Sequence, residues 1–270
     1  MTENTLASSH EFAVQEFSYG EHYEQKLDLH LPDNPVNAPI IFMVHGGAWQ
    51  LGDKAADAVV KNKVARWLPK GFVFISVNYR LLPEADPLQQ ADDIAMALAF
   101  VQKTAKSFNG DGTKIILMGH SSGAHIVSVM SSSARIIAKH KLKPWLGSVV
   151  IDTAVLNVEV MMGGKHFAFY DRAFGADKKF WRLVSPFHLL SNVQPPLLII
   201  CSTKRKDELC DSAETFATKA RALGINAKIL PVDMTHWAVN RGLGKKSDYT
   251  KEVESFMRSL DQRVDQALRL

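Results

Sequence analysis

Six short apolar runs recur along this 270-residue chain, and segments with helical spacing lie between most of them. The run at 40–44 is apolar at every position, which is typical of a strand covered on both faces of its sheet. Strands that alternate with helices predict a mostly parallel sheet with helices on both faces. The six runs lie at 40–44, 72–77, 115–118, 148–151, 197–201 and 227–232.

Two stretches near the N-terminus, 11–17 and 25–31, alternate between apolar and polar residues and predict two further, half-buried strands. The sheet is therefore expected to have eight strands, in one domain that spans residues 1–270. A segment rich in methionine and aromatic residues, 153–185, interrupts the alternation after the sixth strand. It can roof a pocket or simply pack on the domain. Helices are expected at 55–68, 88–105, 122–138, 212–223 and 249–268.

The charge balance and the cysteine content indicate the broad class of protein and its compartment. A net charge of +4, from 32 basic and 28 acidic residues, is too small and too dispersed to indicate a nucleic-acid partner. No window approaches 18 uninterrupted apolar residues, which argues against a membrane span, and the first residues lack the pattern of a signal peptide. Cys201 and Cys210 are expected to be free thiols in a reducing compartment, so we expect a cytoplasmic protein.

A nucleophile motif follows the run at 115–118. The sequence Gly119-His120-Ser121-Ser122-Gly123 lies between a predicted strand and a predicted helix. A serine on such a tight turn needs small neighbours, because the backbone is strained and the helix crosses close to the strand. The pattern predicts that the Ser121 hydroxyl lies at the carboxyl edge of the sheet.

A second motif, His45-Gly46-Gly47-Ala48-Trp49, directly follows the run at 40–44. Its glycines allow the backbone to approach Ser121 closely. The N–H groups of Gly46, Gly47 and Ser122 are then expected to form an oxyanion hole for a tetrahedral intermediate. Both motifs, in this order and each at a strand end, should coincide by chance in fewer than about one in a few hundred chains.

The serine needs a base and an acid that orients the base. His236 is the histidine that follows the last predicted strand, where the base is expected in the chain order serine, acid, histidine. Asp207, which follows the strand at 197–201, is the preferred acid, and the adjacent Glu208 could substitute. Asp152, after the preceding strand, is the main alternative. Asp211 fits better as the N-cap of a helix that begins at residue 212.

These residues resemble the α/β-hydrolase fold, closest to small bacterial carboxylesterases of the hormone-sensitive-lipase and feruloyl-esterase-like groups and to kynurenine formamidases. The resemblance covers nearly the whole chain and implies Ser121 as nucleophile, Asp207 as acid and His236 as base. Two departures, Ala48 in place of a third glycine and G-H-S-S-G in place of G-D-S-A-G, shift the resemblance away from lipases that act on long acyl chains. The matching segments are 25–32, 45–49, 78–81, 119–125, 185–186, 195–196 and 207–211.

We therefore expect a serine hydrolase that cleaves small carboxylic esters through an acyl-enzyme on Ser121. Arylformamidase activity is the alternative, and a non-catalytic binding protein of the same fold is a further one. Trp49 is expected to line an apolar site for a small acyl or aryl group, or else simply to pack.

Neither H-E-x-x-H nor C-x-x-C occurs, so no metal or other cofactor is expected. The expected partner is a small ester or formamide, with no nucleic acid and no membrane. The oligomeric state is left open.

Overall fold

The computed structural model describes residues 13–192, 194–205 and 209–270, which contain one eight-stranded sheet. The strand order is β1-β2-β4-β3-β5-β6-β7-β8. The pairs β1–β2 and β2–β4 are antiparallel, and every other neighbouring pair is parallel. The predicted eight-stranded, mostly parallel sheet is confirmed. The strands are β1 (Val14–Ser18), β2 (Lys26–His30), β3 (Ala38–Val44), β4 (Val73–Val77), β5 (Gly110–His120), β6 (Gly147–Ile151), β7 (Leu197–Ser202) and β8 (Ala227–Val232).

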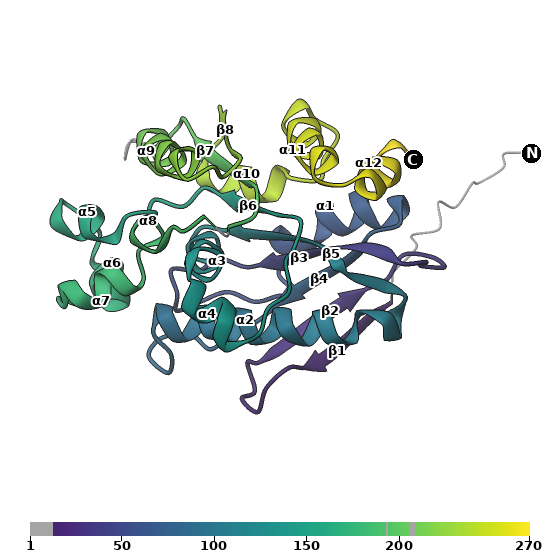
Figure 1. Cartoon of the computed structure of the whole chain (residues 1–270), viewed down its shortest axis with the longest axis horizontal. Coiled ribbons are helices and arrows are strands. Elements are labelled where there is room, and N and C mark those ends of the chain that lie inside the picture. The colour runs from purple at the N-terminus through teal and green to yellow at the C-terminus, as the bar shows by residue number, and fades with distance from the viewer. Residues whose placement is uncertain (1–12, 193, 206–208) are drawn as a thin grey trace, which may run out of the picture.

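Helices cover both faces of this sheet (Figure 1). Successive side chains of β3 point to opposite faces: Ile40 and Phe42 join one apolar core, and Ile41 and Met43 join the other. A strand in this position needs apolar residues throughout, which explains the uninterrupted run. Helices α1, α10, α11 and α12 lie over one core, and α2, α3 and α9 lie over the other. The bounds of these helices and of the short helix α4 are α1 (Asp57–Trp67), α2 (Pro87–Thr104), α3 (Ser122–Ser132), α4 (Ala134–Lys139), α9 (Leu209–Ala222), α10 (His236–Gly242), α11 (Asp248–Leu260) and α12 (Gln262–Arg269).

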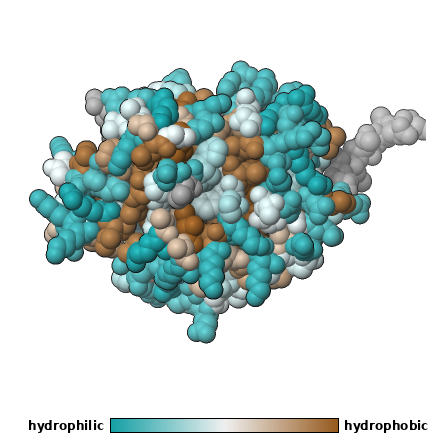
Figure 2. Space-filling model, viewed as in Figure 1, coloured by the Kyte–Doolittle hydropathy of each residue, from teal (hydrophilic) through white to brown (hydrophobic). Residues whose placement is uncertain are grey.

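Four short helices fill the segment between β6 and β7. They are α5 (Val158–Gly163), α6 (Ala168–Phe174), α7 (Lys178–Leu183) and α8 (Pro186–Leu189). Tyr170, Phe174 and Trp181 are buried there, whereas Val160 and Phe167 are exposed. Apolar surface shows between hydrophilic side chains at this end of the molecule (Figure 2). None of the helices in the described part of the chain has the length and apolar content needed to span a lipid bilayer.

Two predicted helices are each divided in the structure. The expected helix at 249–268 breaks at Asp261, whose backbone is extended and whose carboxylate caps α12 by accepting from the Arg263 N–H at 2.9 Å. The expected helix at 122–138 breaks at Ser133, whose side chain caps α4. Apolar spacing continues across both breaks, so the capping residue and not the apolar pattern marks the end of the helix.

The prediction of two free thiols is wrong. Cys201 in β7 and Cys210 in the first turn of α9 form a disulfide, with Cα atoms 5.3 Å apart. The helix begins at Leu209, earlier than predicted, so Asp211 lies in its first turn and is not an N-cap. Because α9 starts early, Cys210 lies beside the end of β7. The separation of nine residues between the two cysteines did not predict this contact.

Lys63 on α1 is a buried cation that joins α1 to α10. Its ammonium Nζ donates to the carbonyls of Ala58 and Asn240 and to the side-chain oxygen of Asn240, each at 2.9 Å. The side chain is 1% exposed. Burial lowers the pKa of Lys63 to about 7.

We predict that Lys63→Met weakens the pH dependence of stability. An unfolded lysine keeps its proton up to about pH 10, whereas folded Lys63 loses it near pH 7. Folding therefore releases a proton between these values, and the free energy of unfolding rises with pH by up to about 1.4 kcal/mol per pH unit. Urea denaturation from about pH 7 to about pH 10 measures this slope.

The control for this experiment is Lys61→Met, because the Lys61 side chain on the same helix is 72% exposed. This variant should keep the slope of the wild type. Stability curves that run parallel for Lys63→Met and the wild type would contradict the prediction.

Candidate active site

Ser121 lies on the sharp turn between β5 and α3. Its φ of +57° is a backbone conformation that residues other than glycine rarely adopt. The Ser121 N–H donates to the Ile151 carbonyl at 2.9 Å, so the strained residue is fixed to the neighbouring strand. This turn leaves the hydroxyl at the carboxyl edge of the sheet.

The glycines on either side of Ser121 are required by space. A Cβ on Gly119 would lie 2.5 Å from the Gly123 carbonyl oxygen. A Cβ on Gly123 would lie 2.2 Å from the His45 carbonyl oxygen and 2.6 Å from that of Val44. Helix α3 therefore crosses the end of β3 at a distance that only a glycine permits.

His236, the first residue of α10, faces Ser121. Its Nε2 lies 3.0 Å from Ser121 Oγ, and its Nδ1 lies 2.6 Å from the Asp152 carboxylate. The Thr235 hydroxyl caps α10 by accepting from the Ala238 N–H, which fixes the start of the helix and so the histidine backbone.

Asp152 follows β6 directly and is fully buried. Its N–H donates to the Ile200 carbonyl at 2.9 Å, and one carboxylate oxygen accepts from the Ser202 N–H at 2.6 Å. Asp207, the acid predicted from the sequence, and Glu208 lie outside the described residues. The imidazole Nδ1 carries one hydrogen, and Asp152 already accepts it, so the structure favours Asp152 over Asp207 as the partner of His236.

The Asp152 carboxylate stays ionised despite its burial. Burial alone would raise the pKa of Asp152, but the hydrogen bonds from His236 and the Ser202 N–H, together with the positive charge of Arg205, lower it below its usual value. Arg205 Nη1 lies 3.4 Å from Asp152 and 2.9 Å from His236 Nδ1. Since a guanidinium only donates and Nδ1 donates to Asp152, the favourable partner of Arg205 in this pair is the carboxylate.

The loop after β3 passes directly against Ser121. A Cβ on Gly46 would lie 2.8 Å from Ser121 Cβ, and one on Gly47 would lie 1.8 Å from the Leu51 carbonyl oxygen. Gly47, Ala48 and Trp49 have φ values of +144°, +51° and +59°. Gly46, Gly47 and Ser122 all line the same cavity as Ser121. This backbone can therefore present N–H groups to a substrate bound at Ser121.

Trp49 anchors this strained loop from inside the protein. The indole N–H donates to His125 Nδ1 at 3.2 Å, and His125 Nε2 donates to the Val184 carbonyl at 2.8 Å. Burial lowers the pKa of His125 to about 4, which keeps Nδ1 free to accept. One histidine thus joins α3, the loop and the segment after α7.

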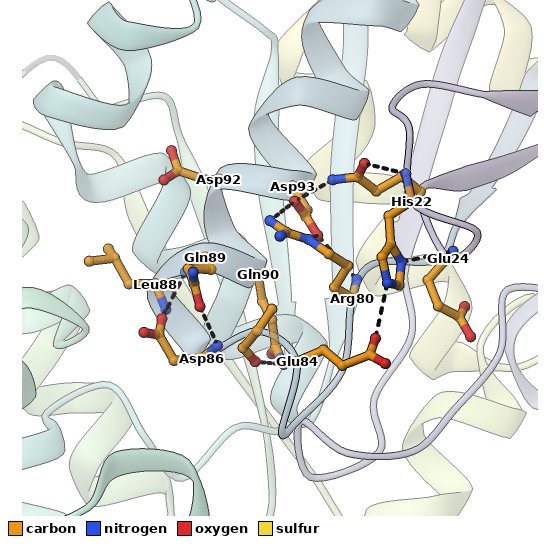
Figure 3. A network of polar contacts seen from close by, with 12 residues as sticks. His22, Glu24, Arg80, Glu84, Asp86, Leu88, Gln89, Gln90, Asp92 and Asp93 are labelled. Atoms are coloured by element: carbon orange, nitrogen blue, oxygen red, sulfur yellow. Dashed lines mark hydrogen bonds and ion pairs between the residues drawn. The ribbon is translucent and has the colours of Figure 1, made fainter.

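A polar network holds the other side of Trp49. The Trp49 carbonyl accepts from the Leu82 N–H and from the Gln90 side chain, both at 2.9 Å. The backbone that leads to Leu82 is in turn held by Arg80, whose guanidinium forms two hydrogen bonds, of 2.7 and 2.9 Å, with the buried Asp93 on α2 (Figure 3). The loop shape is therefore set by contacts made before any substrate binds.

His120, next to the nucleophile, contacts the catalytic candidate His236. Its Nε2 donates to the His236 carbonyl at 3.0 Å, and the two ring centroids lie 4.6 Å apart. Burial and the nearby charge of His236 lower the pKa of His120 to about 3, so this ring is neutral. Sequence reasoning did not assign His120 to the site, because only the fold brings α10 over it.

A cavity of about 610 Å³ opens above Ser121. Trp49, 2% exposed, lines it and also packs against Tyr170 and Phe174, so both expectations for this residue describe it in part. Phe169 and Tyr170 bring the segment between β6 and β7 to the cavity wall. The wall is predominantly apolar around a small polar centre, as is usual for small-molecule sites.

A family model described as BD-FAE matches residues 27–219, from within β2 into α9. The chain belongs to the BD-FAE family. The matched residues of this BD-FAE chain include Gly46, Ser121 and Asp152, whereas His236 lies beyond them.

Individual relatives and solved structures agree with this placement. The probable isoprenylcysteine alpha-carbonyl methylesterase ICME of Oryza sativa subsp. japonica is 33% identical over 111 residues, which are 41% of this chain and 26% of that protein. Esterase LipC of Mycobacterium tuberculosis is 24% identical over 222 residues, or 76% of this chain and 54% of its own length. The BD-FAE chain thus spans about half of LipC and about a quarter of ICME. Esterase 2 of Thermogutta terrifontis has a TM-score of 0.75 at 17% identity, over 91% of this chain and 94% of that one, which confirms the α/β-hydrolase fold.

We predict that Trp49→Phe lowers kcat about tenfold while KM changes less than about threefold. The phenyl ring fills most of the indole space, but it leaves His125 Nδ1 without a donor and frees the loop that carries Gly46 and Gly47. Steady-state hydrolysis of p-nitrophenyl acetate gives both constants.

Trp67→Phe is the matched control. The Trp67 indole N–H donates to Glu254 at 3.0 Å in the opposite core, so this variant should lose stability and keep kcat. A Trp49→Phe enzyme that is also less stable but has the kcat of the wild type would refute a role for Trp49 in holding the loop.

Proposed function

We propose that the chain is a serine carboxylesterase that hydrolyses small esters through an acyl-enzyme on Ser121. The observation that carries the proposal is the continuous chain of contacts from Ser121 Oγ to His236, at 3.0 Å, and from His236 to Asp152, at 2.6 Å. This is the arrangement of nucleophile, base and orienting acid that acyl transfer requires. LipC is named an esterase and ICME a methylesterase, which supports an ester as the substrate.

In the proposed mechanism, His236 Nε2 takes the proton of Ser121 Oγ as the oxygen attacks the ester carbonyl carbon. The N–H groups of Gly46, Gly47 and Ser122 stabilise the negative oxygen of the tetrahedral intermediate. His236 then gives its proton to the leaving alcohol as the ester bond breaks. Water, deprotonated by His236, attacks the acyl-enzyme, and His236 returns this proton to Ser121 Oγ as the acyl bond breaks and the acid leaves. Asp152 holds the imidazole tautomer and stabilises its cation.

Two parts of the expectation drawn from the sequence stay predictions. One is a formamide substrate, to which the names of ICME, a methylesterase, and LipC, an esterase, give no support. The cytoplasmic location rested partly on two free thiols, and the Cys201–Cys210 disulfide removes that support.

We predict that Ser121→Ala lowers hydrolysis of p-nitrophenyl acetate at least about a thousandfold, because no other group can form the acyl-enzyme. Circular dichroism should show an unchanged fold. The control is Ser128→Ala, which removes a buried hydroxyl from α3, the helix that follows Ser121, where it donates to the Ala124 carbonyl at 2.7 Å. Turnover retained by Ser121→Ala would sink the proposal.

A second prediction tests which of the two candidate acids, Asp152 or Asp207, orients His236. Asp152→Asn should lower kcat about a thousandfold or more, because an amide no longer stabilises the imidazolium or selects its tautomer. Asp207→Asn should keep kcat within about threefold, since the Nδ1 proton is already accepted by Asp152. Both variants are assayed with p-nitrophenyl acetate, and a large loss in Asp207→Asn alone would transfer the role to that residue.

A further inference from the structure

Trp237 differs from every other tryptophan in this protein. Its exposed fraction is 73%, whereas those of Trp49, Trp67, Trp145 and Trp181 are between 0% and 9%. An indole is a large apolar surface, and leaving it in water forgoes the free energy that burial would provide. The position of the ring should therefore explain why it is exposed.

That position is at the mouth of the site. Trp237 directly follows His236 at the start of α10 and lines the cavity of about 610 Å³ that contains Ser121. Its ring centroid lies 5.6 Å from that of His236, edge to face, and 6.5 Å from that of His120. One side of the indole thus borders the imidazole that the proposed mechanism uses.

Proton transfer defines which part of a substrate meets this ring. The carbonyl oxygen of the ester faces Gly46, Gly47 and Ser122, whereas the leaving oxygen must come within about 3 Å of His236 Nε2 to receive its proton. The alcohol part of the substrate therefore begins beside the His236 ring. Trp237 is the exposed apolar side chain adjacent to that ring.

We propose that Trp237 is a specificity-determining residue that binds an apolar alcohol group of the ester, aromatic or long aliphatic. The inference rests on the proposed ester hydrolysis and deepens it. The indole supplies an open surface that a benzyl, phenylethyl or hexyl group covers as its oxygen approaches His236. A methyl or ethyl ester is too short to cover the ring. The site thus selects its substrates by the alcohol side.

The test compares acetate esters of ethanol, hexanol and 2-phenylethanol, using the full chain. All three give the same acetyl-enzyme and have leaving groups of similar basicity, so differences in kcat/KM arise from binding of the alcohol. Trp237→Ala should lower kcat/KM about tenfold for the hexyl and phenylethyl esters and less than about twofold for the ethyl ester. Trp237→Phe should restore most of the loss, because a phenyl ring still offers an aromatic face.

Phe167→Ala is the matched control, because Phe167 is 68% exposed but does not line the cavity. It should leave all three values unchanged. An equal loss on all three esters in Trp237→Ala would show a structural role and overturn the inference, as would no loss on any. A wild type that hydrolyses none of these esters, nor p-nitrophenyl acetate, would instead overturn the proposed function, and the inference with it.

Discussion

Helix α3 crosses the end of β3 so closely that there is no space for a side chain between them, and the geometry of the site follows from this contact. Gly123 lies against the carbonyls of Val44 and His45, where a Cβ would come within 2.6 and 2.2 Å of the two oxygens. The same approach places Gly46 against Ser121, so that the nucleophile and the loop after β3 meet through backbone atoms. A larger residue at either glycine would separate the attacking oxygen from the N–H groups proposed to stabilise the intermediate.

Buried neutral histidines then fix the positions of the parts of the site relative to one another. His125 accepts from Trp49 and donates to Val184, and His120 donates to the backbone of His236. Each ring serves as a rigid connector with one donor and one acceptor nitrogen, and burial favours the uncharged form that this requires. Of these three histidines, His236 alone has a carboxylate partner among the described residues, so its role differs from that of the two neutral rings.

The order of strands and helices could be predicted from the sequence because periodicity records burial, and β3 is buried on both faces. Ser121 and His236, which lie close together in the structure, could be selected because each follows a strand that the pattern reveals. The choice between Asp152 and Asp207 could not be made in this way. Both follow predicted strands in the sequence, and the contact of Asp152 with the imidazole depends on its φ of +56°, which no spacing encodes. The contact of Cys210 with Cys201 likewise depends on where α9 begins.

The hydrogen bonds of the sheet continue one residue past the ends of two strands, and this sets Ser121 and Asp152 apart from His236. The Ser121 N–H is bonded to the Ile151 carbonyl and the Asp152 N–H to the Ile200 carbonyl, so both residues move with the sheet. His236 belongs to a helix of seven residues that is held through side chains, among them His120 of β5 and Lys63 of α1. Local opening of short helices needs less free energy than disruption of a central sheet. Local opening of α10 would therefore displace His236 while Ser121 and Asp152 keep their places, and refolding of the helix would restore the contact between His236 and Ser121.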